Sequence, residues 1–266
     1  MHDFEYLKPA SLADAVKALK AEPEAVPVSG GMTLLPTLKL RLAQPSHLID
    51  IARLKELQGI KTDGATLTIG AGTTHRAVAT STDVRAFLPA LAAMADLIGD
   101  PQVRNRGTIG GSVANNDPAA DYPAACIALG ATVVTSEREV AADDFFVDLF
   151  ETALEHGELV TAVRFPKPKR AAYQKFRNPA SRYAMVGVFV AEGPAGVRVA
   201  VTGAGQSGVF RVPEMEAALT RSFAPASVAS IKIDPERLNS DIHGSAVYRA
   251  HLVTVMARRA VEQALG

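Results

Sequence analysis

Apolar residues in the first fifth of the chain follow helical and strand-like patterns in alternation. Ser11 opens the first helical pattern as a capping residue, and Pro23 ends it. After the next apolar run, Leu34, Leu35 and Leu38 recur at helical spacing. The expected elements are a helix over 12–22, a strand over 25–28, a helix from about 33 to 42 and a strand over 47–51. This order predicts a small βαβ lobe over residues 1–55.

Shorter strands and longer helical patterns fill the next hundred residues. The run ATLTIGA alternates and ends in glycine, and Thr74 can cap a helix that follows it. A broad apolar face predicts one helix from Asp83 to Ile98. Further expected elements are a strand over 65–71, a helix over 75–81, a buried helical stretch over 123–129, and strands over 131–136 and 159–165. Together they predict a larger mixed lobe over residues 56–166.

Proline and basic residues at 166–170 indicate a linker into a C-terminal α+β domain over 170–266. In the segment 196–202, Val197, Val199 and Val201 alternate with Arg198, Ala200 and Thr202, a pattern typical of a sheet covered on one side. The expected elements are strands over 173–177, 185–191 and 196–202, with helices over 214–220 and 246–265. They predict a small antiparallel sheet with helices across it.

Composition excludes several functional classes. Among the 266 residues, Lys+Arg and Asp+Glu number 28 each, so no net charge attracts nucleic acid or an anionic membrane. No apolar run approaches the length of a membrane span, and no basic-apolar leader stands at Met1. We therefore expect a soluble, cytoplasmic protein that neither binds nucleic acid nor inserts into a membrane.

Cysteine and histidine usage argues against a metal site on this chain. Cys126 is the one cysteine, which rules out an intrachain disulfide and a four-thiolate iron–sulfur cluster. The six histidines form no ligand pair at metal spacing. His75 has no serine or cysteine nucleophile context, so we expect a structural role for it. We assign no metal ligand and no catalytic residue.

Two glycine pairs carry the candidate chemistry. Gly110 and Gly111 lie in the polar stretch 98–123, and Gly30 and Gly31 lie between a strand and a helix. Glycine lets backbone amides approach a ligand, and amides at a concavity or a helix start bind phosphate. Ordinary tight turns would look the same. The spacing matches neither the GxGxxG fingerprint nor the P-loop, so these residues indicate a pyrophosphate site of another kind.

The segments SGGMTLLPTLKLR and IGDPQVRNRGTIGGSVANNDPAADYPAACIALGA resemble the FAD-binding subunit of the molybdenum hydroxylases, the group of xanthine dehydrogenase and aerobic carbon monoxide dehydrogenase. The tail SDIHGSAVYRAHLVTVMARRAVEQAL resembles the medium subunit of carbon monoxide dehydrogenase. The resemblance implies an α+β fold: a two-lobed FAD-binding domain of the vanillyl-alcohol-oxidase type, followed by the C-terminal domain. It also implies FAD as cofactor.

The same resemblance implies the cofactor-binding residues. The pyrophosphate would lie between two glycine turns, at Ser29, Gly30, Gly31, Met32 and Thr33, and at Thr108, Ile109, Gly110, Gly111 and Ser112. Met32 and Ser112 replace a histidine and an asparagine of relatives, so contacts of those side chains do not carry over. The remaining implied contacts are Ile98 on the adenine, Val160 beside the flavin ring, Asp121 on the ring or ribityl chain, and Lys175 and Tyr183 reaching the isoalloxazine.

Each of these assignments has a plainer alternative. Asp121 is also placed to cap the helix near Pro123, and Ile98 and Val160 are equally consistent with core. Lys175 is also consistent with a basic strand edge.

The function implied is electron output from a heterotrimeric molybdenum hydroxylase. Its partners would be a large molybdenum-cofactor subunit and a small iron–sulfur subunit, in a dimer of heterotrimers. A stand-alone flavoenzyme of this fold, or an interaction protein that has lost FAD, are the competing hypotheses. Arginine-bearing loops at 102–106 and 177–183 are candidates for the docking surface.

Overall fold

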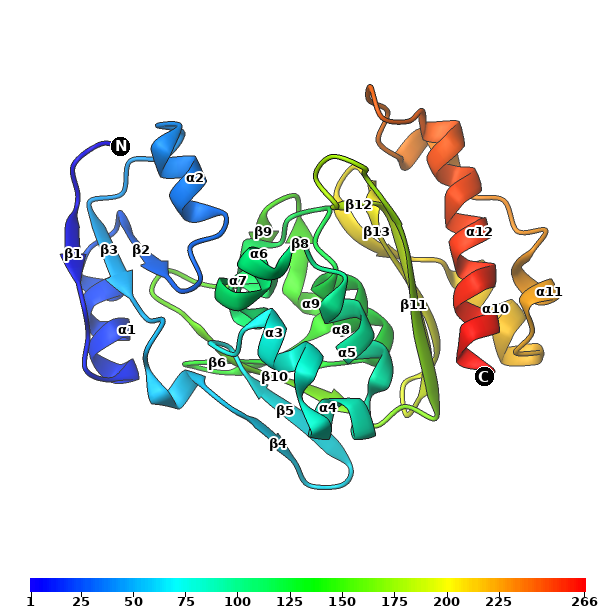
Figure 1. Ribbon diagram of the computed structural model, residues 1–266, viewed down its shortest axis with the longest axis horizontal. Helices are drawn as coiled ribbons and strands as arrows, with labels where there is room; N and C mark the ends of the chain where they lie inside the picture. The colour runs from blue at the N-terminus through cyan, green and yellow to red at the C-terminus, as the bar shows by residue number, and fades with distance from the viewer.

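The computed structural model describes all residues from Met1 to Gly266, and its three larger sheets are arranged along the long axis of the molecule. The N-terminus lies at one end of that axis, and helix α12 lies at the other (Figure 1). No helix combines the length and the apolar character that a bilayer span needs.

The first sheet is parallel and has the strand order β1-β3-β2. Its elements are β1 (Glu5–Leu7), α1 (Leu12–Ala21), β2 (Ala25–Val28), α2 (Leu34–Lys39) and β3 (His47–Asp50). Ser11 caps α1 as predicted, accepting a hydrogen bond from the Asp14 amide at 3.1 Å. Helix α2 is shorter than predicted, because only Leu38 of its apolar pattern is buried, while Leu40 and Leu42 are exposed.

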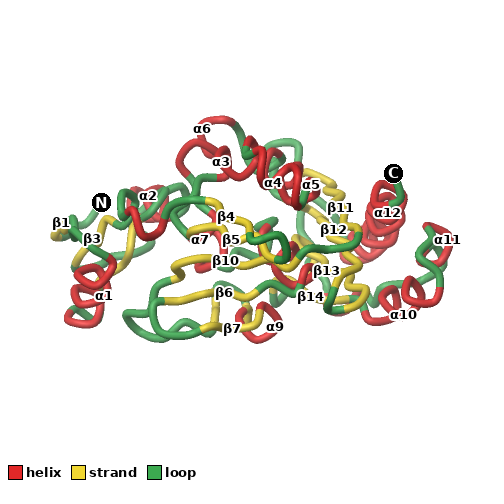
Figure 2. The backbone as a smooth tube through the Cα atoms, turned by 90° about the horizontal axis from the view of Figure 1, so that it is seen from below, coloured by secondary structure: helices red, strands yellow, loops and turns green.

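The second sheet is antiparallel, with the order β4-β5-β10-β6-β7 (Figure 2). Its strands are β4 (Ile60–Thr62), β5 (Thr66–Gly70), β6 (Thr132–Thr135), β7 (Glu139–Ala141) and β10 (Val160–Pro166). A 3-10 turn, Lys55–Leu57, precedes it, and the small hairpin of β8 (Phe146–Asp148) and β9 (Glu151–Thr152) lies beside it. Strand β10 is the central strand of this sheet. The residues just before it reach the first lobe, where Leu159 joins the small core of α1 and β3.

Helices fill the connection between β5 and β6, and continue after β7. They are α3 (His75–Thr80), α4 (Thr82–Phe87), α5 (Pro89–Asp96), α6 (Pro101–Arg106), α7 (Ile109–Asn115), α8 (Tyr122–Leu129) and α9 (Ala142–Phe145). The cap of α3 by Thr74 is confirmed. The single helix predicted over 83–98 is wrong: Pro89 lacks the amide that a continuous helix needs and forces Leu88 out of helical geometry, so the chain breaks into α4 and α5.

The third sheet is an antiparallel meander of β11 (Arg170–Arg177), β12 (Ala184–Gly193), β13 (Gly196–Gly205) and β14 (Gly208–Arg211). Helices α10 (Pro213–Arg221), α11 (Pro225–Val228) and α12 (Ala246–Ala264) follow, with the 3-10 turn Pro235–Arg237 between the last two. The expectation of a sheet covered on one side is wrong. Val199 and Val201 face the core formed with α10 and α12, but Ala200 and Phe189 are buried in the core of the second lobe.

Candidate cofactor-binding site

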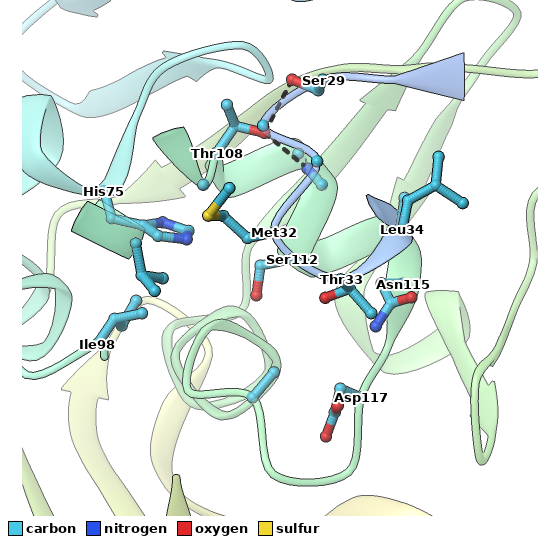
Figure 3. Close-up of a pocket in the computed structure, with 18 of the residues that line it drawn as sticks. Ser29, Met32, Thr33, Leu34, His75, Ile98, Thr108, Ser112, Asn115 and Asp117 are labelled. Carbon is cyan, nitrogen blue, oxygen red and sulfur yellow. Dashed lines mark hydrogen bonds between the residues drawn. The ribbon is translucent and has the colours of Figure 1, made fainter. Parts of the chain in front are cut away.

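A cavity of about 650 Å³ lies where the three sheets approach one another (Figure 3). The loop from β2 to α2, the segment from α6 to α7, strand β11 and the loop 180–183 all line it. Its volume falls within the range of small-molecule and cofactor sites. Every predicted site residue lines it except Ile109, which is fully buried in the core of the second lobe.

The loop Gly30–Thr33 presents free donors to this cavity. The backbone amides of residues 30–34 have no hydrogen-bond acceptor within the protein, because α2 begins at Leu34 and its first internal bond runs from the Leu35 amide to the Gly31 carbonyl. Gly31 has φ of +72°, a conformation that favours glycine. Only Gly30 of this row is buried, and Met32 and Thr33 are exposed, but five successive amides without an acceptor at a cavity wall suit an anionic ligand.

The second glycine pair lies at the start of a helix instead of in the expected open turn. Residues 109–112 form the first turn of helix α7, and their amides are already bonded. The acceptors are the Thr73 carbonyl for Ile109, the Ala71 carbonyl for Gly110 at 2.8 Å, and Thr108 for both Gly111 and Ser112. A Cβ on Gly110 would lie 2.4 Å from the Ala71 Cβ, so this glycine allows α7 to pack against the end of β5.

The two glycine segments contact each other directly. The hydroxyls of Ser29 and Thr108 are 3.1 Å apart, and a Cβ on Gly30 would lie 2.2 Å from the Arg106 carbonyl oxygen. The loop therefore lies against the segment that connects α6 to α7. We conclude that the first segment supplies the donors and the second fixes their position.

A buried ion pair lies at another part of the cavity wall. Lys175 Nζ is 2.8 Å from Asp121 Oδ2, and their side chains are only 1% and 5% exposed. Tyr173, two residues before Lys175 on β11, donates its hydroxyl to the other carboxylate oxygen. Burial, and then the charge of Asp121, raise the pKa of Tyr173. The alternative that Asp121 caps the helix after it is wrong, because its side chain bonds no amide of α8.

The cavity also holds residues that sequence reasoning did not assign. Tyr173, which was also not assigned, does not line the cavity but donates its hydroxyl to Asp121, and its place two residues before Lys175 puts both side chains on the same face of the strand. His75 lines the cavity as a buried side chain, and burial, and then the charge of Arg104, lower its pKa to about 4. Burial raises the pKa of Asp117, which also lines the cavity.

The mouth of the cavity carries the more exposed predicted residues. Tyr183 is 49% exposed, and burial, followed by the charges of Asp117 and Asp121, raises its pKa. Met32 is also partly exposed, whereas Val160 belongs to both the cavity wall and the core.

The segment 102–106, expected as a docking loop, is largely helix α6, which Asp100 caps at 2.9 Å. Arg104 is tied down within it. The guanidinium donates to the Ile98 carbonyl at 3.0 Å and lies 3.4 Å from Asp96. Arg104 therefore fixes the loop that carries Ile98.

The chain is similar to a family of known proteins. Residues 2–168 match the model described as "FAD binding domain in molybdopterin dehydrogenase". The carbon monoxide dehydrogenase medium chain of Hydrogenophaga pseudoflava is 38% identical, over 98% of this chain and 96% of its own. The nicotine 6-hydroxylase medium subunit of Paenarthrobacter nicotinovorans is 36% identical, over 97% and 96%.

Solved structures agree over the whole length. The structure of carbon monoxide dehydrogenase from Hydrogenophaga pseudoflava superposes with a TM-score of 0.89 at 37% identity, covering 99% of this chain and 98% of that one. Quinoline 2-oxidoreductase from Pseudomonas putida 86 gives a TM-score of 0.89 at 30% identity, covering 99% and 97%.

Proposed function

Because the chain belongs to the family of FAD-binding domains in molybdopterin dehydrogenases, and is a FAD-binding subunit of an oxidoreductase complex, we propose that it transfers electrons within that complex. The electrons would come from iron–sulfur clusters on a partner chain and pass to an external acceptor. FAD supplies the redox chemistry when bound, and the protein binds and orients it.

The residues of the cavity fit this cofactor. The free amides of residues 30–34 suit a diphosphate, which needs several donors. We assign the predicted lining residues, Ile109 excepted, to FAD: the loop Ser29–Thr33 to the diphosphate, and Lys175 with Asp121 to the ring end. The row of free amides is the observation that carries the proposal.

The partner chains follow from what this chain lacks and from the names of its relatives. One buried cysteine cannot hold an iron–sulfur cluster, so the clusters must be on another subunit. The relatives are named as medium chains or medium subunits, which implies larger and smaller companions. We propose a large molybdenum-cofactor subunit and a small iron–sulfur subunit, assembled as a dimer of heterotrimers.

Substrate choice would lie on the large subunit. The named relatives act on carbon monoxide, nicotine and glyceraldehyde, while sharing more than 30% identity with this chain over nearly its full length. Of these relatives, the carbon monoxide dehydrogenase medium chains are more similar to this chain than the other two. This favours carbon monoxide as the substrate of the complex. A large-subunit gene beside this one that lacks the cysteine of a copper–molybdenum site would exclude it.

The test uses the co-expressed complex. Gly30→Val should prevent the loop from packing against Arg106. The complex should then contain its metals but no FAD. Its clusters should still accept electrons from a reductant, and the external acceptor should no longer reoxidise them. Gly193→Ala is the matched control, since its nearest atom would be 3.4 Å away.

Three outcomes would contradict the proposal. Reoxidation of the clusters at the normal rate without FAD would remove this chain from the electron path. Rapid reduction of the isolated, FAD-loaded chain by NADPH would instead favour a stand-alone flavoenzyme. A chain that never shows a flavin spectrum would favour an interaction protein.

A further inference from the structure

His75 is a buried polar side chain whose ring has no hydrogen-bond partner. It is 5% exposed, and its Nδ1 is enclosed by the protein without a donor or acceptor in reach. The ring nevertheless lines the cofactor cavity, and no dashed line reaches it in Figure 3. Nδ1 is sealed from the cavity, so a ligand bound there can reach only Nε2, for which the chain provides no hydrogen-bond partner either.

The position of the ring places Nε2 close to the loop of free amides. A Cβ on Gly107 would lie 2.6 Å from His75 Nε2, so the ring packs directly against this glycine. A Cβ on Gly30 would in turn lie 2.7 Å from the Gly107 Cα. Gly107 is therefore the one residue between His75 and the loop. The imidazole and the loop of residues 30–34 both line the cavity, and Gly107 lies against both.

The surroundings keep this ring neutral. Arg104 of α6 is the charged group that acts on it, and a second positive charge nearby would be unfavourable. Tyr122 of α8 is the titratable group packed on the ring, with centroids 5.4 Å apart, and it is buried and uncharged. A neutral imidazole carries one proton. Since Nδ1 has no acceptor, the proton is better placed on Nε2, where the cavity can provide one.

We propose, on the basis of the proposed assignment of the FAD diphosphate to the amides of residues 30–34, that His75 is a further cofactor-binding residue whose Nε2–H donates a hydrogen bond to that diphosphate. The chemical class recognised is a phosphate oxygen. Neither the glycine pairs nor any charged side chain provides this contact.

Calorimetric titration of the FAD-depleted full chain provides the first test, with FAD, ADP and riboflavin as probes. His75→Ala should weaken FAD and ADP by about 10- to 100-fold, the worth of a hydrogen bond to a charged group. Riboflavin has no phosphate, so its affinity should not change. His75→Gln, which keeps a side-chain donor, should recover part of the loss. Equal losses for all three probes, or no loss for ADP, would overturn the proposal.

A second measurement needs no variant and decides the matter if His75→Ala does not fold. The imidazole of His75 is followed by ¹⁵N NMR of the wild-type chain as the pH is lowered. A bound anion favours the charged ring, so ADP should raise the His75 pKa above its value of about 4, and riboflavin should not. An ADP-saturated protein in which His75 titrates as in the free chain would show that the ring and the phosphate do not meet.

Discussion

At the scale of single residues, three of the four glycines in the two motifs are required, each for its own reason. Gly30 and Gly110 would bring a Cβ against backbone atoms of Arg106 and Ala71, which cannot move aside cheaply. A Cβ on Gly111 would meet only the Thr108 hydroxyl, at 3.0 Å. Gly31 is needed for its positive φ.

We therefore expect Gly30→Ala to remove most of the bound FAD, because the loop must leave Arg106 and its amides no longer converge. Overpacking of this kind also costs about 1–3 kcal/mol of stability. Gly111→Ala should cost well under half of that and keep the cofactor. Flavin content per chain and thermal unfolding measure both. The assignment of the donors to the first segment would be wrong if Gly111→Ala lost more FAD than Gly30→Ala.

The pair of Lys175 and Asp121 is the second feature at this scale. Because Asp121 neutralises Lys175 at 2.8 Å, the lysine presents little net charge to the cavity. Asp121→Asn should leave an uncompensated cation that favours the reduced, negatively charged flavin. The flavin midpoint potential should rise on the order of 30 mV or more, which is ~1.4 kcal/mol for a two-electron couple.

Lys175→Met should shift the potential in the opposite direction. Tyr173→Phe is the control, since it removes a hydrogen bond to Asp121 without altering charge. A redox titration of each FAD-loaded variant measures the three potentials. An unchanged potential with Asp121→Asn would mean that the flavin ring lies away from this pair.

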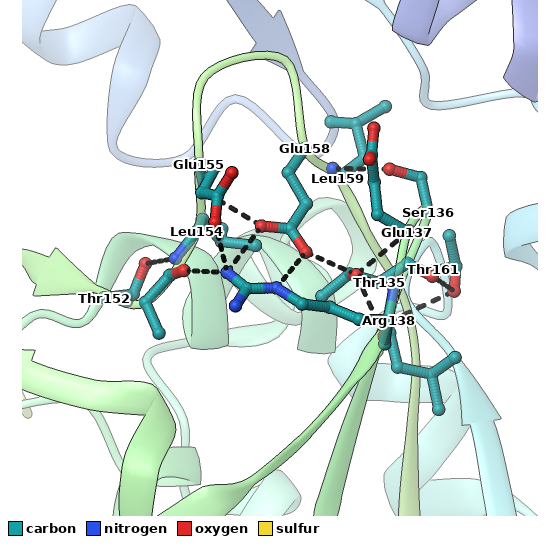
Figure 4. A network of polar contacts seen from close by, with 12 residues as sticks. Thr135, Ser136, Glu137, Arg138, Thr152, Leu154, Glu155, Glu158, Leu159 and Thr161 are labelled. Atoms are coloured by element: carbon teal, nitrogen blue, oxygen red, sulfur yellow. Dashed lines mark hydrogen bonds and ion pairs between the residues drawn. The ribbon is translucent and has the colours of Figure 1, made fainter.

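At the scale of elements, an ion-pair network fixes the turn that leads into β10 and the cavity (Figure 4). Glu158 accepts hydrogen bonds from Arg138 Nε at 3.0 Å, from the Thr135 hydroxyl at 2.6 Å and from the Glu155 amide at 2.8 Å. Burial alone would raise the pKa of Glu158, but these bonds outweigh it and hold the pKa at about 2. The turn is thereby fixed two residues before Val160 lines the cavity.

Glu158→Gln should destabilise the protein by on the order of 2–3 kcal/mol at neutral pH. The folded pKa lies below the unfolded value, so this stability is complete above the unfolded pKa of about 4.3 and is lost as the pH falls towards about 2. The gap in unfolding free energy between wild type and variant should narrow over that interval in denaturant titrations. Glu155→Gln, at an 80% exposed side chain, should change little. If the difference in unfolding free energy between wild type and variant did not change with pH, the ionised form of Glu158 would not be the source of this stability.

At the scale of the whole molecule, the hydrophobic core does not stop at the end of the family match. The largest cluster, of 33 residues, combines α5 and α8 of the second lobe with Tyr173, Phe189 and Ala200 of the third sheet. Burial of apolar area is the main stabilising contribution in folding, so the third sheet supports the cofactor lobe as well as its own helices.

A chain that ends at Pro168 should therefore fail to fold cooperatively, although it contains every residue of the matched domain. It would expose the faces of α5 and α8 and lack Lys175 altogether. Circular dichroism melting and size-exclusion chromatography, with the full chain as reference, measure this. A monomeric fragment with a sharp melting transition close to that of the full chain would show that the second lobe folds without the third sheet.

The order of helices and strands could largely be predicted from the sequence, because local periodicity, caps and prolines act within a few residues. Ser11 and Thr74 cap helices as their positions indicate, and β10 ends at Pro166. The errors arose where one local signal opposed another. Pro89 divides an apolar face that is otherwise continuous, and the leucines after Lys39 have no core to face.

The sequence by itself determined which residues gather at the cavity, since glycine pairs and the residues around them imply a cofactor of a known kind. Only the tertiary structure decided their roles. Whether an amide is free depends on what lies opposite it: the amides of residues 30–34 have no acceptor, whereas Ala71 and Thr73 bond those of α7. Asp121 likewise bonds to β11, more than fifty residues away, instead of capping its own helix, and His75 faces the cavity without a partner. Local sequence could not reveal these partners, because each was supplied by a segment distant in the chain.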